Sequence, residues 1–352
     1  MILVLCVNYY LLYTRNLDDF PKIMIKHNLK GLTYNRLDIE KIEEIMKKPI
    51  VQLTQNVYDF VALKWQIYAL SKMYPFLKVY SIGKSVNQLP LYLIRLGCGP
   101  RKIHVNGSHH GNEWLTSYIL MESIEKLCEA YKHKQSINDV DIKDLLECVT
   151  FDFVPMVNPD GVMLAIEGTR SEYFTQAHLK WNEYAYDFSR WKANARGVDL
   201  NRNYDAGFKA YQMLSKLEKP AYAYYQGPFP ESEPESKALA DLTRKQNYDL
   251  VLAYHTQGEV IYWTYDNMDV ASSKEYAKMF EKASQYALEE PEPLAVSGGY
   301  KDWFIKMFHK PGFTIECGLG VNPISVHQSE EILRRTLPII LLAGKDLRKE
   351  EN

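Results

Sequence analysis

The stretch "KIHVNGSHHGNEWLTSYILMESIEKLCEAYKH", residues 102–133, decides the fold class because it joins a short strand to a long helix. Its first seven residues have the apolar character of a buried strand. From Glu113 onward, apolar side chains recur every three or four residues, which predicts an amphipathic helix. Two adjacent histidines, His109 and His110, lie between the two elements. A strand followed by a helix is the building unit of α/β folds.

The same alternation of strands and helices continues on both sides of this stretch. Upstream, a helix is expected at 59–74 and strands at 77–86 and 89–97. Downstream, strands are expected at 149–157, 250–256, 260–265 and 313–317, and helices at 233–246, 272–288, 298–308 and 329–349. The segment "NPDG" at 158–161 predicts a turn, and the polar excursion at 167–234 is long enough to build a site. We therefore expect an α/β fold with a mixed, mostly parallel central sheet and helices on both faces.

The composition is that of an ordinary globular protein, with 46% hydrophobic and 24% charged residues. The 352 residues are most simply one large domain at 56–352, preceded by an N-terminal segment at 1–55 that ends in a charged helical pattern. A formal net charge of -2 shows no excess of basic residues, so nucleic acid is not an expected partner.

Five cysteines without a CxxC pattern predict neither a disulfide framework nor a thiolate metal site, and they favour a reducing compartment. The apolar opening "MILVLCVNYYLLY" is too short to cross a bilayer and has no basic start or small-residue cleavage site. We expect it to pack on the domain as a strand or helix, with an atypical secretion signal as the alternative. The expected location is therefore the cytoplasm, without stable membrane insertion, and the sequence carries no signal of oligomeric state.

Polar residues with metal-binding side chains stand where expected strands end: His109 and His110, His255, and Glu316. In open α/β sheets, ligands bind beyond these carboxyl ends. His110 precedes Glu113 by three residues, and such an H-x-x-E element can supply two zinc ligands if a third comes from elsewhere. A zinc ion that activates water needs three protein ligands and one open position. The spacing of His109 suits this geometry poorly, so we expect it to support a ligand or to pack.

Each of these residues has an ordinary alternative role. Glu113 can simply stabilise a helix N-terminus through the helix dipole. His255 can be a strand-end histidine without a function, whereas a lone Glu316 is costly to bury without a partner. Asn201 and Arg202, in "GVDLNRNYDAGF", can belong to a solvated loop.

Six segments in order, "GSHHGNEW", "VNPDG", "RGVDLNRNYDAGF", "AYHTQG", "SGGYKDWF" and "FTIECG", resemble the zinc carboxypeptidase family. The resemblance implies that family's fold, a metallopeptidase activity and one zinc ion per chain. By position, His110, Glu113 and His255 resemble the zinc ligands. Glu316 resembles the general base that takes the water proton and passes it to the leaving amine.

Other matching positions concern the substrate. Asn201 and Arg202 resemble the pair that clamps a substrate carboxylate, a role that suits a planar guanidinium. Where many members have an arginine that polarises the scissile carbonyl, "SRWKANARGVDLNRN" aligns best with Lys192, although Arg190 and Arg196 are near. A cation aimed at the developing oxyanion contributes about 3 kcal/mol, so we assign this role to Lys192.

Two further positions depart from the digestive members of the family. The tyrosine that caps the substrate in those members has no counterpart, because its position holds Leu294. Tyr300 can compensate by contacting substrate, or it can pack in the core. The pocket-floor position holds Lys301, which favours an anionic group on the substrate. The alternative is a lysine that extends to solvent from the start of a helix.

The strings "GYKDWFI", "RWKANARGVDLNRN" and "AYHTQGEVIYW" are similar to the bacterial γ-D-glutamyl-meso-diaminopimelate peptidase branch, which cuts peptidoglycan stem peptides. The extra carboxylate of diaminopimelate agrees with a lysine at the pocket floor. Branch members often carry LysM wall-binding modules, of which "IKHNLKGLTYNRL" is at best a degenerate trace. The resemblance thus implies a peptidoglycan-derived peptide as substrate. A general metallocarboxypeptidase or related amidase is one alternative, and a catalytically dead wall-peptide-binding module is another.

Overall fold

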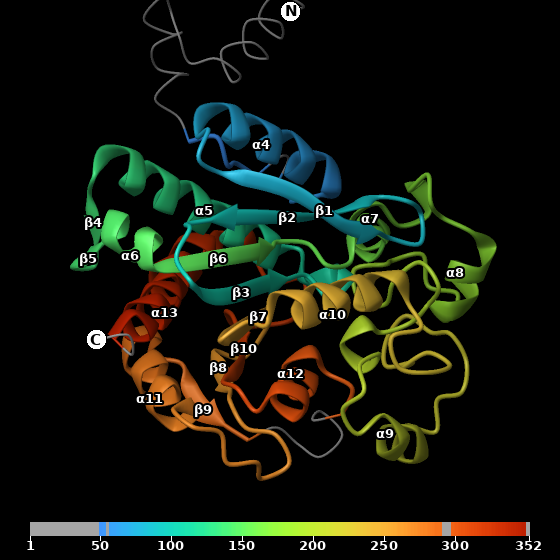
Figure 1. Ribbon diagram of the computed structural model, residues 1–352. Coiled ribbons are helices and arrows are strands. Elements are labelled where there is room, and N and C mark those ends of the chain that lie inside the picture. The colour runs from blue at the N-terminus through green and yellow to red at the C-terminus, as the bar shows by residue number, and fades with distance from the viewer. Residues whose placement is uncertain (1–48, 54–55, 291–296, 350–352) are drawn as a thin grey trace, which may run out of the picture.

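A mixed sheet of eight strands runs through the part of the chain that the computed structural model describes, residues 49–53, 56–290 and 297–349 (Figure 1). The strand order is β1-β2-β6-β3-β7-β10-β8-β9. The strands of this sheet are β1 (Lys78–Lys84), β2 (Pro90–Leu96), β3 (Arg101–Gly107), β6 (Val149–Val154), β7 (Leu250–His255), β8 (Val260–Tyr262), β9 (Ala287–Glu289) and β10 (Gly312–Glu316). A separate small hairpin pairs β4 (Ser136–Ile137) with β5 (Val140–Asp141).

Parallel pairing holds the centre of the sheet together. The pairs β6-β3, β3-β7 and β7-β10 are parallel, as is β8-β9 at one edge. The pairs β1-β2, β2-β6 and β10-β8 are antiparallel. The predicted mixed, mostly parallel sheet is therefore confirmed.

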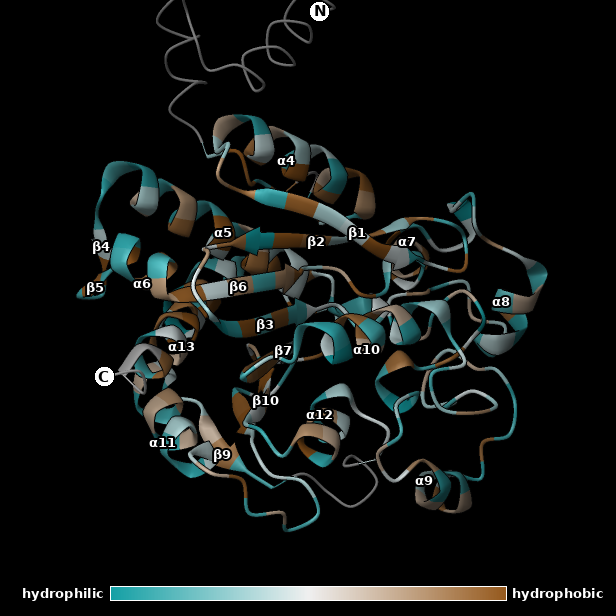
Figure 2. Cartoon of the chain, in the orientation of Figure 1, coloured by the Kyte–Doolittle hydropathy of each residue, from teal (hydrophilic) through white to brown (hydrophobic). Residues whose placement is uncertain are grey.

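Helices cover both faces of the sheet. They are α4 (Phe60–Met73), α5 (Leu115–His133), α6 (Ile142–Cys148), α7 (Pro159–Glu167), α8 (Gln176–Trp181), α9 (Phe208–Ser215), α10 (Pro234–Gln246), α11 (Ser273–Ser284), α12 (Tyr300–Phe308) and α13 (Ser329–Lys349). Helices α5, α6, α11 and α13 pack on one face, whereas α10 and α12 pack on the other (Figure 1). Hydrophobic residues prevail on β2, β6 and β10 in the interior, and hydrophilic residues prevail on α8 and α10 (Figure 2).

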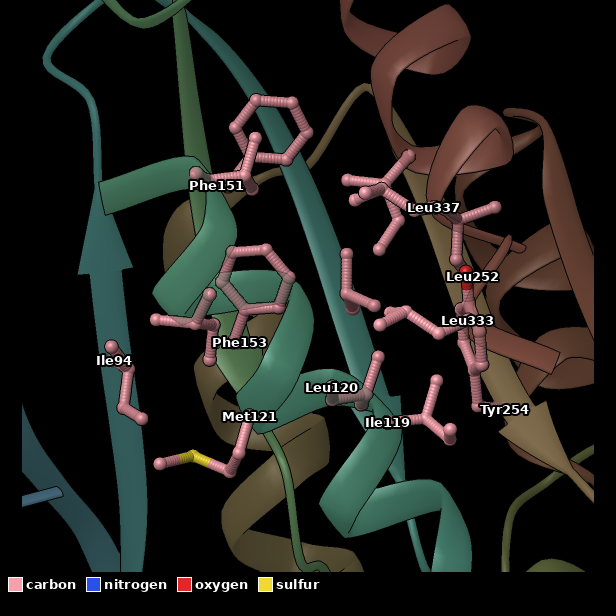
Figure 3. Packing of buried hydrophobic residues seen from close by; sticks show 14 of the residues in the cluster. Ile94, Ile119, Leu120, Met121, Phe151, Phe153, Leu252, Tyr254, Leu333 and Leu337 are labelled. Carbon is pink, nitrogen blue, oxygen red and sulfur yellow. The ribbon is translucent and has the colours of Figure 1, made fainter. Parts of the chain in front are cut away.

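Strand β7 explains why both faces need a cover. Side chains alternate across a strand, and every residue of β7 is buried. Leu252 and Tyr254 enter the core under α5 and α13, while Val251 and Ala253 enter the core under α10 and α12. Figure 3 shows the first of these cores, where Leu333 of α13 faces β7. Each fully buried aliphatic side chain of this kind stabilises the fold by about 1.5–3 kcal/mol.

The strand register brings the polar strand ends together. In the parallel pair β7-β10, Glu316 is the direct partner of His255. In the parallel pair β3-β7, Gly107 is the partner of Tyr254, so the loop that follows β3 begins beside the end of β7. Side chains from three different strand ends therefore share one edge of the sheet.

Three local predictions differ from the structure. The predicted turn at 158–161 is the start of α7, because Asn158 caps that helix by accepting from Gly161 N–H and Pro159 occupies the first turn. The helix expected from Glu113 begins at Leu115, after a 3₁₀ turn at Gly111–Glu113. The helix expected at 272–288 ends at Ser284, and the chain then forms β9. The predicted N-terminal strand or helix and the degenerate LysM trace lie outside the described residues.

Candidate active site

Three buried side chains converge at the carboxyl edge of the sheet. His110 Nδ1 lies 2.7 Å from Glu113 Oε1, and His255 Nδ1 lies 2.8 Å from Glu113 Oε2. One ligand atom from each residue falls within 4.8 Å of the other two. Among the described residues, this is the one group of three or more His, Cys, Asp or Glu side chains that could hold a metal ion. The sequence predicted this trio, and the structure brings its members together.

The loop that carries His110 and Glu113 is held from below by the start of α7. A side chain at Gly111 would place its Cβ 2.3 Å from the carbonyl oxygen of Gly161, so only glycine fits this close approach. Asn158 Nδ2 donates to the carbonyl oxygens of His109, Lys192 and Ala193 at 3.0–3.2 Å. This one amide therefore ties the metal-binding loop to the segment that carries Lys192.

Asp199 orients the first histidine of the trio. Its Oδ1 lies 3.2 Å from His110 Nε2, and the same carboxylate accepts from the backbone N–H groups of Asn201 and Tyr224. A hydrogen bond from Nε2–H leaves the lone pair of the neutral ring on Nδ1, which is the atom that faces Glu113. This arrangement fits a metal ligand.

The charges of the trio are strongly coupled. Burial opposes ionisation of Glu113, but His110 and His255 hold its pKa well below its usual range. Burial also opposes a charged ring on His110, yet Glu113 and Asp199 raise its pKa to about 9. Two imidazoles and one carboxylate around a buried point are the donor set that zinc prefers at a catalytic site.

A cavity of about 240 Å³ opens beside the trio. Glu316 lines it, and burial together with the nearby charge of Glu113 raises the pKa of this carboxyl to about 8. A carboxyl group with a pKa near neutrality, next to a metal site, is suited to accept and return a proton. The register of β7-β10 thus places the predicted general base next to the predicted ligands.

The structure separates the three candidate oxyanion cations. Lys192 lines the cavity, and its Nζ lies 3.6 Å from Glu113 Oε1. Burial opposes its charge, but Glu113 and Asp199 raise its pKa, so it stays an ammonium. Arg190 instead pairs with Glu183, and Arg196 lies 3.6 Å from Glu233. Of the three, only Lys192 lines the cavity, and its role at the oxyanion stays a prediction.

Asn201 and Arg202 lie together in the 3₁₀ turn Leu200–Arg202 and both line the cavity. Arg202 Nη1 donates to the carbonyl oxygen of Asn201, and its Nε is buried without a hydrogen-bond partner. Gly298, with a φ of +77°, packs so closely that a Cβ there would lie 2.3 Å from the Arg202 carbonyl oxygen. That contact fixes the turn against the start of α12.

A match to the family model described as zinc carboxypeptidase spans residues 64–332. The chain belongs to the zinc carboxypeptidase family. It is therefore a zinc-dependent peptidase. Zinc is the metal that the trio of His110, Glu113 and His255 would hold.

Relatives and solved structures agree with this membership. The chain is 38% identical to γ-D-glutamyl-L-diamino acid endopeptidase 1 of Lysinibacillus sphaericus, over 82% of this chain and 72% of that protein. It is 32% identical to the uncharacterized protein YqgT of Bacillus subtilis, over 81% and 77% of the two chains. The structure of bovine thrombin-activatable fibrinolysis inhibitor in complex with tick carboxypeptidase inhibitor aligns with a TM-score of 0.67 at 19% identity, covering 84% of this chain and 98% of that one. At that identity, the structural match supports the zinc carboxypeptidase fold alone.

Against this family background, Tyr300 is corrected from a substrate contact to a core residue. Its side chain is fully buried, its hydroxyl lies 2.8 Å from Thr243 Oγ1, and it is absent from the cavity lining. Successive residues of a helix point about 100° apart. Lys301 of α12 thus lines the cavity while the Tyr300 ring packs against His104 of β3, with 5.7 Å between the ring centroids.

Lys301 lines the cavity as predicted, but it does not extend to solvent, since only 4% of it is exposed. His109 is fully buried and lies behind the trio, where its Nε2 is 3.1 Å from the Tyr204 hydroxyl. Burial lowers the pKa of His109 well below its usual range, so the ring is neutral. It packs beside His255 with the rings stacked at 5.6 Å between centroids.

Sequence reasoning gave no role to two residues that build the zinc carboxypeptidase site here. Asp199 and Asn158 stand inside the segments "RGVDLNRNYDAGF" and "VNPDG", but neither spacing nor residue type indicates their partners. Asp199 contacts a histidine 89 positions away, and Asn158 contacts a carbonyl 49 positions away. Contacts at such separations depend on the folded chain.

Proposed function

We propose that this peptidase hydrolyses the bond between γ-D-glutamate and a diamino acid in peptidoglycan stem peptides. The observation that carries the proposal is that Arg202 and Lys301 both line the cavity, where Lys301 is paired with Asp302. An apolar lining would suit aromatic or aliphatic C-terminal residues, whereas these charged side chains suit a leaving residue whose own side chain is charged. The name of the Lysinibacillus sphaericus relative, 38% identical, supports the same bond.

Zinc held by the trio would supply a water of lowered pKa and would polarise the scissile carbonyl. In the chain itself, Glu316 accepts the proton of the attacking water and returns it to the leaving amine. The Lys192 ammonium stabilises negative charge on the scissile carbonyl oxygen, a role in which a cation contributes about 3 kcal/mol. Arg202 and Asn201 bind a carboxylate of the leaving residue and hold the bond in place.

A general metallocarboxypeptidase remains the competing activity, and one assay separates it from the proposal. The protein is incubated with the peptide L-Ala-γ-D-Glu-meso-diaminopimelate-D-Ala and with peptides that end in phenylalanine or arginine. Mass spectrometry then identifies the products with and without a chelator. We expect cleavage after γ-D-glutamate that stops with chelator and returns with zinc. Cleavage of only the ordinary peptides would contradict the proposal.

The cytoplasm stays the proposed location, on the basis of cysteine use. The cysteines at 98, 128, 148 and 317 are all free thiols in the structure, which agrees with a reducing compartment. None of the helices in the described ranges has the length and apolar character needed to cross a bilayer. The division into an N-terminal segment at 1–55 and a catalytic domain at 56–352 also stays a prediction.

A further inference from the structure

Asn322 lies in the loop that follows β10 and lines the same cavity as Lys192 and Glu316, although nothing in the sequence pattern indicates a role for it. The start of this loop is bound to the end of β7, because Cys317 N–H donates to the His255 carbonyl oxygen at 2.8 Å. The loop that carries Asn322 is therefore anchored next to the metal-binding trio.

Thr256 holds the amide of Asn322 in one orientation. Thr256 Oγ1 donates to Asn322 Oδ1 at 2.6 Å, and Asn322 Nδ2 donates to the Thr256 carbonyl oxygen at 2.7 Å. The amide cannot be turned end for end, because two oxygens without a hydrogen would then face each other. These contacts use one of the two hydrogens on Nδ2, so a second N–H remains as a donor.

Two donors from different segments of the chain converge on one point beside the trio. Asn322 Nδ2 lies 3.4 Å from Glu113 Oε1, and Lys192 Nζ lies 3.6 Å from that same oxygen. Both separations exceed the usual hydrogen-bond length of about 2.9–3.0 Å, so neither contact saturates its donor. A single oxygen atom at the edge of the cavity can thus be within reach of both.

Lys192 by itself supplies charge but little direction. An ammonium is a compact point charge on a flexible stem, whereas a planar guanidinium presents two fixed donors. The contacts of Lys192 Nζ are long, at 3.6 Å to Glu113 Oε1 and 5.9 Å to the centroid of the Tyr224 ring. The amide of Asn322 adds a directed donor without adding a further charge to the cavity.

We propose that Asn322 Nδ2 and Lys192 Nζ together form the oxyanion site of this peptidase. As the new C–O bond to water forms and Glu316 accepts the water proton, the π electron pair of the scissile carbonyl moves to its oxygen. This oxygen accepts from the amide of Asn322 and from the ammonium of Lys192. Donors that are in place before the charge develops stabilise the transition state more than the ground state.

The inference rests on the proposed function for the role of Lys192. It adds Asn322 as a second catalytic residue at the scissile carbonyl. Its action does not depend on which leaving residue is bound, because the oxyanion forms on the other side of the bond that breaks.

Asn322→Leu removes the donor and keeps a side chain of similar size. In the zinc-loaded chain acting on L-Ala-γ-D-Glu-meso-diaminopimelate-D-Ala, we expect kcat to fall by about 10²- to 10³-fold, the loss typical of one oxyanion donor. KM and bound zinc should change by less than about threefold. An unchanged kcat, or a loss that appears as a higher KM or as missing zinc, would overturn the inference. Asn322→Ala decides by the same criteria if Asn322→Leu does not fold.

Gln328→Leu is the matched control for a purely structural role of Asn322. Gln328 holds the same loop through two hydrogen bonds of 2.9 Å with the backbone of Leu319, and it is not among the residues that line the cavity. We expect its kcat to stay within about threefold of that of the unmodified chain. An equal loss of kcat in Gln328→Leu and Asn322→Leu would mean that Asn322 only holds the loop, and would refute the inference.

A binding measurement separates an oxyanion role from other causes of slow turnover. In a phosphinate analogue of the same peptide, a tetrahedral phosphorus with two oxygens replaces the scissile carbonyl carbon. Its dissociation constant, measured by calorimetry on the zinc-loaded chain, should rise in Asn322→Leu by the same factor by which kcat/KM falls. A dissociation constant equal to that of the unmodified chain would count against the inference.

The substrate decides separately on the proposed function. If the unmodified chain cleaves only peptides that end in phenylalanine or arginine, the proposed bond is wrong. The same variants are then compared on those peptides, because an oxyanion forms in either reaction, and the criteria for Asn322 stay the same.

Discussion

Replacing Asp199 by asparagine should weaken zinc binding without removing a zinc ligand. Asp199 accepts three hydrogen bonds, from His110 Nε2–H at 3.2 Å and from the backbone N–H groups of Asn201 and Tyr224 at 3.1 and 3.0 Å. An asparagine has one acceptor oxygen and one donor amide in the same place. Its amide nitrogen must therefore face a donor, so either His110 and the backbone N–H of Asn201 lose their acceptor or the backbone N–H of Tyr224 does.

The expected size follows from the role of His110. Loss of the group that orients a metal-binding histidine costs 10- to 100-fold in metal affinity, or about 1.4–2.7 kcal/mol. At a fixed zinc concentration above the dissociation constant, the zinc-dependent part of the unfolding free energy falls by the same amount as the zinc-binding free energy. Replacement by alanine would leave both backbone N–H groups unpaired, so asparagine is the cleaner change.

Zinc affinity is measured by competition with a chromophoric chelator at about pH 9. This pH matters because Glu113 and Asp199 outweigh burial and raise the pKa of metal-free His110 to about 9, so a proton competes with zinc below it. Asp205→Asn is the matched control, since Asp205 belongs to the same segment but pairs with Lys306 away from the cavity. Equal zinc affinity in the Asp199 variant and the unmodified chain would refute the orienting role.

Three further changes test other parts of the site and fold. Glu316→Gln should lower kcat by about 10²- to 10⁴-fold with zinc content unchanged, as measured by turnover and metal analysis. Loss of zinc would contradict the role of Glu316 as a general base. Lys192→Met should lower kcat by about 10²- to 10³-fold with partial recovery in Lys192→Arg, and an unchanged kcat would exclude an oxyanion role. Glu235 is buried near Asp160, which raises its pKa from 4.5 to about 8. The folded chain therefore keeps a proton that the unfolded chain releases, and stability falls as pH rises from about 4.5 to 8, by at most about 1.4 kcal/mol per unit. In urea unfolding, the free energy of the Glu235→Gln variant should not show this fall with rising pH. The same pH dependence in the variant and the unmodified chain would contradict the prediction.

Much of the fold could be predicted because its signals are local. Apolar runs of strand length alternate with segments of helical period, and this alternation requires a sheet with helices on both faces. The elements whose predicted type or bounds differ from the structure are short or depend on helix capping. Asn158 and Pro159 resemble a turn in isolation, but in the structure Asn158 caps α7, Pro159 occupies its first turn, and Gly161 packs against the loop at Gly111.

The sequence by itself determined the chemistry available to this protein. The three-residue spacing of His110 and Glu113, with His255 and Glu316 at other strand ends, predicted that these groups meet at one edge of a parallel sheet, and the resemblance to zinc carboxypeptidases implied their roles as ligands and base. Only the tertiary structure decided which neighbours control those groups. It joined Asp199 to His110, directed Lys192 rather than Arg190 into the cavity, and turned Tyr300 into the core. It also paired Lys301 with Asp302 inside the cavity. These outcomes depend on side-chain direction and on contacts between distant segments, which the register and packing of the folded chain set and which no local pattern encodes.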